Sequence, residues 1–142
     1  MTLATRCGMV GIGALAILSL GQWVRGGTFE STPILAYVLG VLPNLAAAVA
    51  IPFVSMACWL EVYRLTDPGR HQRTFLLWVA FGTVGLVIWE LVQRGGNLVF
   101  DPHDIAATMV GAVAAFVIFQ MVAPGALAGS ARKSSVMEDG RR

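Results

Sequence analysis

Acidic and amide side chains gather around one turn between two apolar stretches of the chain. Glu90 and Gln93 lie near the end of the first stretch, with Arg94 directly after Gln93, and Asp101 and Asp104 open the second stretch. Three of the eight acidic residues therefore fall in this segment. A carboxylate inside an apolar, membrane-crossing stretch is costly, which makes Glu90 a candidate functional group. Two neighbouring carboxylates can also divide the roles of acid and base between them.

The composition places these residues in a membrane protein. Of 142 residues, 56% are hydrophobic and 13% are charged, against roughly 25% charged in a typical soluble domain. Apolar stretches recur at close to the roughly 20 residues that a helix needs to cross a bilayer. These features exclude a soluble enzyme, and no basic cluster indicates nucleic-acid binding.

The stretches predict an all-α integral membrane protein with a four-helix transmembrane bundle. The membrane domain is expected to cover 1–124, with spans at about 7–24, 44–63, 75–93 and 102–122. Residues 125–142 are small, polar and charged, and predict a disordered tail on the cytoplasmic side.

The second stretch is too long for one simple span. A helix from Pro33 to Arg64 would reach about 48 Å, against a hydrocarbon core of about 30 Å. Pro43 removes a backbone donor and disfavours helical geometry at Leu42. The sequence therefore predicts an extra short interfacial or re-entrant helix at 33–41, followed by the true span.

Basic residues predict the orientation of the bundle. Lys and Arg near span ends favour the cytoplasmic side, and four spans put both termini on one side. All but two of the ten basic residues fall on that side, namely Arg6, Arg64, Arg70, Arg73, Arg132, Lys133, Arg141 and Arg142. The exceptions, Arg25 and Arg94, fall on the other side. Both termini are therefore predicted to be cytoplasmic, with the Glu90 to Asp104 segment facing outward.

Each acidic residue also has a purely structural explanation. Asp101 followed by Pro102 is typical of a helix start, and Asp104 at the third position suits the positive end of the helix dipole. Glu90 could extend to the interface or pair with Arg94 one turn on. The competing explanation gathers the polar residues of this end into one head-group site, consisting of Arg25, Asn44, Glu90, Gln93, Arg94, Asp101 and Asp104. For Asn44, the structural alternative is a cap of the second span.

Metal and cofactor chemistry have no support in the sequence. His103 stands alone, without the Cys, His or carboxylate spacing of a metal site, and fits an exposed turn residue. Neither a nucleophile elbow nor a phosphate loop is found. We expect no metal and no cofactor.

Small residues recur along one face of the last predicted span. Ala107, Gly111 and Ala115 are four residues apart, a spacing that lets another helix approach closely. This ridge predicts tight helix packing, either within the bundle or against another membrane protein.

These residues resemble the VanZ-like family of small bacterial membrane proteins. The matching segments are WELVQ, with Glu90 and Gln93, FDPHD, with Asp101 and Asp104, TMVGA, with Gly111 and Ala112, and LPN at 42–44. The chain departs from the pattern at Thr108, where many relatives have Asn. The resemblance covers about 70 residues and implies a multi-pass protein of the bacterial cytoplasmic membrane, with a role in the cell envelope.

The sequence thus leaves alternatives from different classes open. The first is a protein that binds a lipid-linked envelope precursor or an anionic lipid through the outward polar residues. The second is an enzyme of envelope-lipid metabolism that uses Glu90 and Asp104 as an acid and base pair. The third is an assembly partner that docks another membrane protein on the small-residue ridge.

Overall fold

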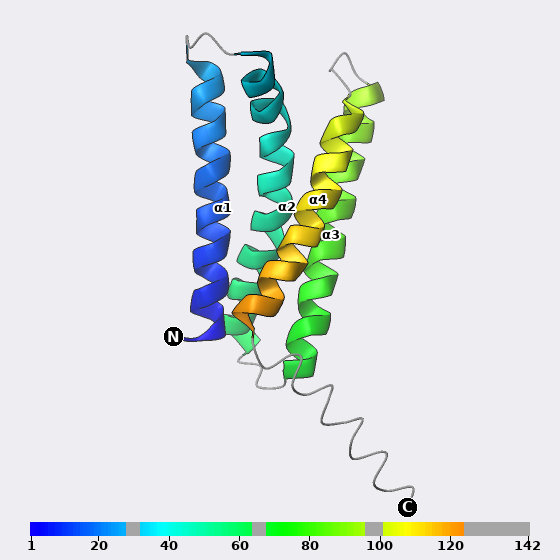
Figure 1. Cartoon of the computed structure of the whole chain (residues 1–142). Helices are drawn as coiled ribbons and strands as arrows, with labels where there is room; N and C mark the ends of the chain where they lie inside the picture. The colour runs from blue at the N-terminus through cyan, green and yellow to red at the C-terminus, as the bar shows by residue number, and fades with distance from the viewer. Residues whose placement is uncertain (28–31, 64–67, 96–100, 124–142) are drawn as a thin grey trace, which may run out of the picture.

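The described part of the chain is entirely helical. The computed structural model describes residues 1–27, 32–63, 68–95 and 101–123. They form α1 (Leu3–Gly26), α2 (Pro33–Tyr63), α3 (Pro68–Gly95) and α4 (Pro102–Val122), and no strand occurs in these ranges (Figure 1). All four helices are long and apolar enough to span a membrane, which confirms the predicted all-α class and four spans. The predicted tail, 125–142, lies outside the described residues.

The helices extend beyond the predicted apolar limits. α1 begins at Leu3 and α3 begins at Pro68, earlier than the predicted residues 7 and 75. Hydropathy marks only the apolar part of a helix, whereas backbone hydrogen bonding continues into the polar interface. Proline at the first helical position suits the start of α3, because the missing N–H would have no partner there.

α2 differs from the prediction, because the separate short helix at 33–41 is not present. Residues 33–63 form one helix of 31 residues that contains Pro43 and Pro52. The Thr32 hydroxyl accepts a hydrogen bond from Leu35 N at 3.3 Å and caps its start. Transmembrane helices tolerate proline where neighbouring groups compensate for the lost bond. At about 46 Å the helix is longer than a hydrocarbon core of about 30 Å, and its residues 33–38 are exposed.

The centre of the bundle is packed mainly by aromatic and small side chains. Phe53, Phe75 and Phe119 are fully buried. The rings of Phe75 and Phe119 stack with centroids 3.9 Å apart, and Phe53 meets Phe75 edge-on at 4.9 Å. These rings tie α2, α3 and α4 together in one core, while many large apolar side chains remain exposed around the bundle. Such a surface suits contact with lipid.

Glycines bring α2 close to its neighbours. A Cβ on Gly111 of α4 would lie 2.7 Å from the Cβ of Ala48 and 2.7 Å from the carbonyl oxygen of Leu45. A Cβ on Gly11 of α1 would lie 2.7 Å from Val54. Ala107, Gly111 and Ala115 are all buried. The predicted ridge therefore packs inside the bundle, and among its members Gly111 lies against α2.

The two ends of the bundle are chemically different. The amino terminus of the chain and the last turn of α4 lie at one end (Figure 1), where the Arg6 guanidinium donates to the Val122 carbonyl oxygen at 3.2 Å. The last turn of α1 and the first turn of α4 lie at the opposite end (Figure 1). The predicted polar residues are placed toward this second end.

Candidate functional site

Three helices bring polar side chains together toward the second end of the bundle. The Asn44 amide of α2 donates to Glu90 Oε1 of α3 at 3.1 Å. Gln93, three residues after Glu90, donates to the same oxygen at 3.4 Å. Residues three apart on a helix share a face, so one side of α3 presents both groups to α2. We call Asn44, Glu90, Gln93 and Asp104 the polar cluster.

Glu90 is the most unusual member of the polar cluster. Only 3% of its surface is exposed, so the carboxylate does not extend to the interface as the structural alternative proposed. Both amide donors reach Oε1, and Oε2 is buried with no hydrogen-bond partner in the described part of the chain. A buried carboxylate oxygen without a donor is unfavourable, because it has lost water and gained nothing in return.

Asn44 links the two carboxylates of the polar cluster. Besides its bond to Glu90, its side chain lies near the Asp104 carboxyl group and acts on it as a donor. An amide NH₂ carries two donors, which suits one residue placed between two acids. The alternative that Asn44 caps the second span is wrong, because it lies well inside α2. Thr108 lies one turn after Asp104 on α4, and its buried hydroxyl donates to the Asp104 backbone oxygen at 2.9 Å.

Asp101 is the cap of α4 that the sequence predicted. Its carboxylate accepts from His103 N at 2.9 Å and lies 2.7 Å from His103 Nδ1. The backbone hydrogen bond from His103, and then the contact with its side chain, hold the pKa of Asp101 below its ordinary value of 3.8. His103 is exposed and meets the Tyr37 ring of α2 edge-on, with centroids 5.5 Å apart. The contact between Tyr37 and His103 therefore joins the start of α4 to α2.

The cap gives the bundle a pH dependence that can be measured. Because the pKa of folded Asp101 is lowered, its stabilising effect is complete above the unfolded value and is lost as pH falls through the folded pKa. Asn also caps helices but does not titrate. Between neutral pH and about pH 3, which is below the ordinary pKa of Asp, we expect the wild type to lose more thermal stability than Asp101→Asn. Equal losses in parallel melting curves would show that the cap carries no charge effect.

The remaining predicted residues stand in different relations to the polar cluster. Arg25, in the exposed last turn of α1, interacts electrostatically with Asp104, as do Asp101 and His103. The Arg94 side chain lies outside the part of the chain that the structure describes, so the predicted pair with Glu90 stays a prediction.

Tyr37 was missed by the sequence reasoning, which assigned it to a separate helix. A lone Tyr near a span end is equally typical of an interface anchor.

The polar cluster is chemically an acceptor site. It offers carboxylate and amide oxygens around Glu90, which is 3% exposed, so a group that donates hydrogen bonds or carries positive charge would be stabilised there. In the described ranges, no group of three or more His, Cys, Asp or Glu side chains could hold a metal ion. Asn44, Glu90 and Asp104 can instead hold a donor group or share a proton.

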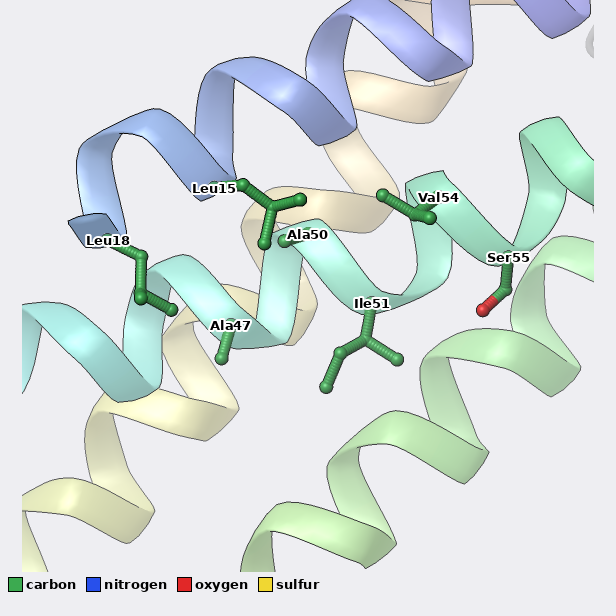
Figure 2. A pocket seen from close by; sticks show the side chains of 7 residues that line it. All are labelled: Leu15, Leu18, Ala47, Ala50, Ile51, Val54 and Ser55. Atoms are coloured by element: carbon green, nitrogen blue, oxygen red, sulfur yellow. The ribbon is translucent and has the colours of Figure 1, made fainter.

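An apolar groove lies on α2 below the polar cluster. Figure 2 shows its lining, with Leu15 and Leu18 from α1 and the other side chains from α2. Its volume is about 420 Å³, and Ser55 supplies the hydroxyl among otherwise apolar lining residues. Ala47, at one end of this stretch of α2, follows Asn44 by three residues and so lies on nearly the same helix face. The groove therefore begins about one helical turn from Asn44, although no member of the polar cluster lines it.

Comparisons of the chain with protein-family models, with curated proteins and with solved structures give no match.

Proposed function

We propose that this protein binds the head group of a membrane lipid, either a lipid-linked envelope precursor or an anionic lipid, in its polar cluster. In this proposal the chain lies in the bacterial cytoplasmic membrane with both termini in the cytoplasm, as the distribution of Lys and Arg predicts. The polar cluster then faces the outer leaflet, where the head groups of such lipids lie.

The observation that carries the proposal is the buried Oε2 of Glu90. This oxygen has no donor in the described part of the chain, while Oε1 of the same carboxylate accepts from Asn44 and Gln93. A hydroxyl, amide or amine of a bound head group would supply the missing donor. Arg25, which acts on Asp104, would offset negative charge elsewhere on the head group.

The groove on α2 supports a lipid as the ligand. It lies within a membrane span and begins one helical turn from Asn44. A hydrocarbon chain attached to a head group in the polar cluster would run along this groove. Ala47, Ile51 and Val54 would contact it with apolar atoms (Figure 2), as expected for a lipid tail in the bilayer.

The resemblance to VanZ-like proteins supports the same proposal. The residues that carry the resemblance include all four members of the polar cluster, namely Asn44, Glu90, Gln93 and Asp104. We propose that the chain is a VanZ-like protein of the cell envelope on this ground, and that the residues of the shared pattern are those that meet the ligand.

A second candidate function is an enzyme of envelope-lipid metabolism. The link through Asn44 between Glu90 and Asp104 favours it, because two nearby carboxylates can differ in protonation and act as acid and base. Incubating the purified protein with lipid extract and looking for new products separates the two functions. Turnover that is lost in Asp104→Asn would establish the enzyme. If the lipids are recovered unchanged, the enzyme function is overturned and lipid binding stays the proposed function.

Native mass spectrometry of the purified protein tests the binding function. We expect the wild type to retain a defined lipid, and Glu90→Gln and Asp104→Asn each to lower its occupancy by about tenfold, the effect of one charge-assisted hydrogen bond. The lipid's identity would then name its pathway.

The matched control is Glu61→Gln. Glu61 is an exposed carboxylate near the opposite end of α2, so its replacement should leave the retained lipid unchanged. If all four proteins hold the same bulk lipids, the carboxylates of the polar cluster do not bind a head group.

A further inference from the structure

The polar cluster has an excess of acceptors and negative charge over donors. Glu90, Asp101 and Asp104 lie at this end of the bundle, and Arg25 is the arginine that acts on Asp104 there. His103 is already engaged with Asp101. Asn44 and Gln93 donate to Glu90, but they bring no charge. The described side chains of the polar cluster therefore contain two carboxylates and no cation.

Because Glu90 is buried, the excess of negative charge in the polar cluster favours one class of ligand group over others. An exposed carboxylate is satisfied by water, but Glu90 is 3% exposed and its Oε2 is buried without a donor. A buried ionised carboxylate is stabilised best by a positive charge that also donates hydrogen bonds. A neutral hydroxyl would supply the bond without the charge, and a bare phosphate would add negative charge to a negative site.

We propose that the group bound by Glu90 is an ammonium, so that the ligand, whether a lipid-linked precursor or another lipid, carries an amino group in its head group beside any anionic group. This inference rests on the proposed function. An ammonium is compact and has three donors. In this assignment one donor binds Glu90 Oε2 and another binds Asp104, on which the same Asn44 side chain acts. The amine, and not a phosphate or a hydroxyl, therefore selects the lipid.

A lipid competition with the wild-type protein tests this assignment. The protein, stripped of bound lipid, is placed in mixed micelles with equal amounts of phosphatidylethanolamine, phosphatidylglycerol and phosphatidylcholine, and the retained lipid is measured by native mass spectrometry. These head groups offer an ammonium with N–H donors, hydroxyls without a cation, and a cation without N–H donors. We expect phosphatidylethanolamine to be retained over each of the others by at least about tenfold, the ratio given by one charge-assisted hydrogen bond.

Variants assign the preference to the site. Glu90→Gln removes the charge at nearly constant shape, so the ratio between the lipids should fall to about one, while Glu61→Gln should keep the wild-type ratio. The competition with the wild-type protein does not depend on the folding of any variant, so it tests the ammonium assignment by itself.

Failure of this inference differs from failure of the proposed function. Equal or stronger retention of phosphatidylglycerol by the wild type would overturn the ammonium assignment. If that retention were lost in Asp104→Asn, head-group binding would still stand. Retention of all three lipids without preference, and without response to Glu90→Gln or Asp104→Asn, would overturn both.

Discussion

Replacing Gly111 by alanine should lower the free energy of unfolding of the bundle by about 1 to 3 kcal/mol, the usual cost of overpacking a close contact. The added methyl would lie 2.7 Å from Ala48 Cβ and 2.7 Å from the Leu45 carbonyl oxygen. The second of these atoms belongs to the α2 backbone and cannot rotate away. α4 would have to move from α2, which would also disturb Asp104, two turns earlier on α4. Unfolding in detergent micelles, followed by circular dichroism, measures the loss.

Gly85→Ala is the matched control for this prediction. Gly85 also lies inside a spanning helix, but a Cβ there meets nothing within 4 Å. Since alanine is a better helix former by roughly 0.5 to 1 kcal/mol, this variant should be as stable as the wild type or slightly more stable. If Gly111→Ala behaved in the same way, α4 would not depend on close contact with α2.

The sequence was sufficient to predict the spans because the bilayer itself sets their length. Apolar stretches near 20 residues must become helices in hydrocarbon, where every backbone group needs an internal partner. The break at Pro43 was wrong for a related reason. Proline removes one backbone hydrogen bond, but α2 continues through Pro43 as one helix of 31 residues, so this loss alone does not end a helix.

The candidate site was predictable within single helices but not between them. The spacing of Glu90 and Gln93 places both on one face, and Asp101 with Pro102 predicts a helix start; the structure has both features. The partner of Glu90 could not be predicted, because periodicity indicates which residues share a face and not which helix lies opposite. Asn44 was therefore assigned to a helix end, whereas it lies between Glu90 and Asp104.

The small-residue ridge illustrates the same limit. The spacing of Ala107, Gly111 and Ala115 predicts that a helix approaches closely, but it fits a helix of this chain and a helix of another protein equally well. In the structure Gly111 lies against the α2 backbone at Leu45, so the helix that approaches it belongs to this chain. The third class, an assembly partner, would have to use a different surface.

Replacing Asn44 by leucine should destabilise the bundle by about 1 to 3 kcal/mol, because a buried carboxylate would lose one of its two amide donors. Leucine has the same number of side-chain heavy atoms as asparagine and suits a membrane span, and the double variant below separates the loss of the hydrogen bonds from the change of shape. If Asn44 only faced lipid, the same change would be neutral or stabilising. Ser19→Leu, at an exposed position of α1, provides that reference in the same unfolding measurement.

The double variant Asn44→Leu with Glu90→Gln tests whether the two residues act through each other. With the charge removed, the loss of the Asn44 amide should cost less, so the double variant should be more stable than the sum of the single losses predicts. A coupling of about 1 kcal/mol or more, typical of residues in one hydrogen-bond network, would establish that Asn44 stabilises the bundle through the Glu90 carboxylate. Additive losses would instead mean that Asn44 acts elsewhere, and the bond across α2 and α3 would not hold the polar cluster together.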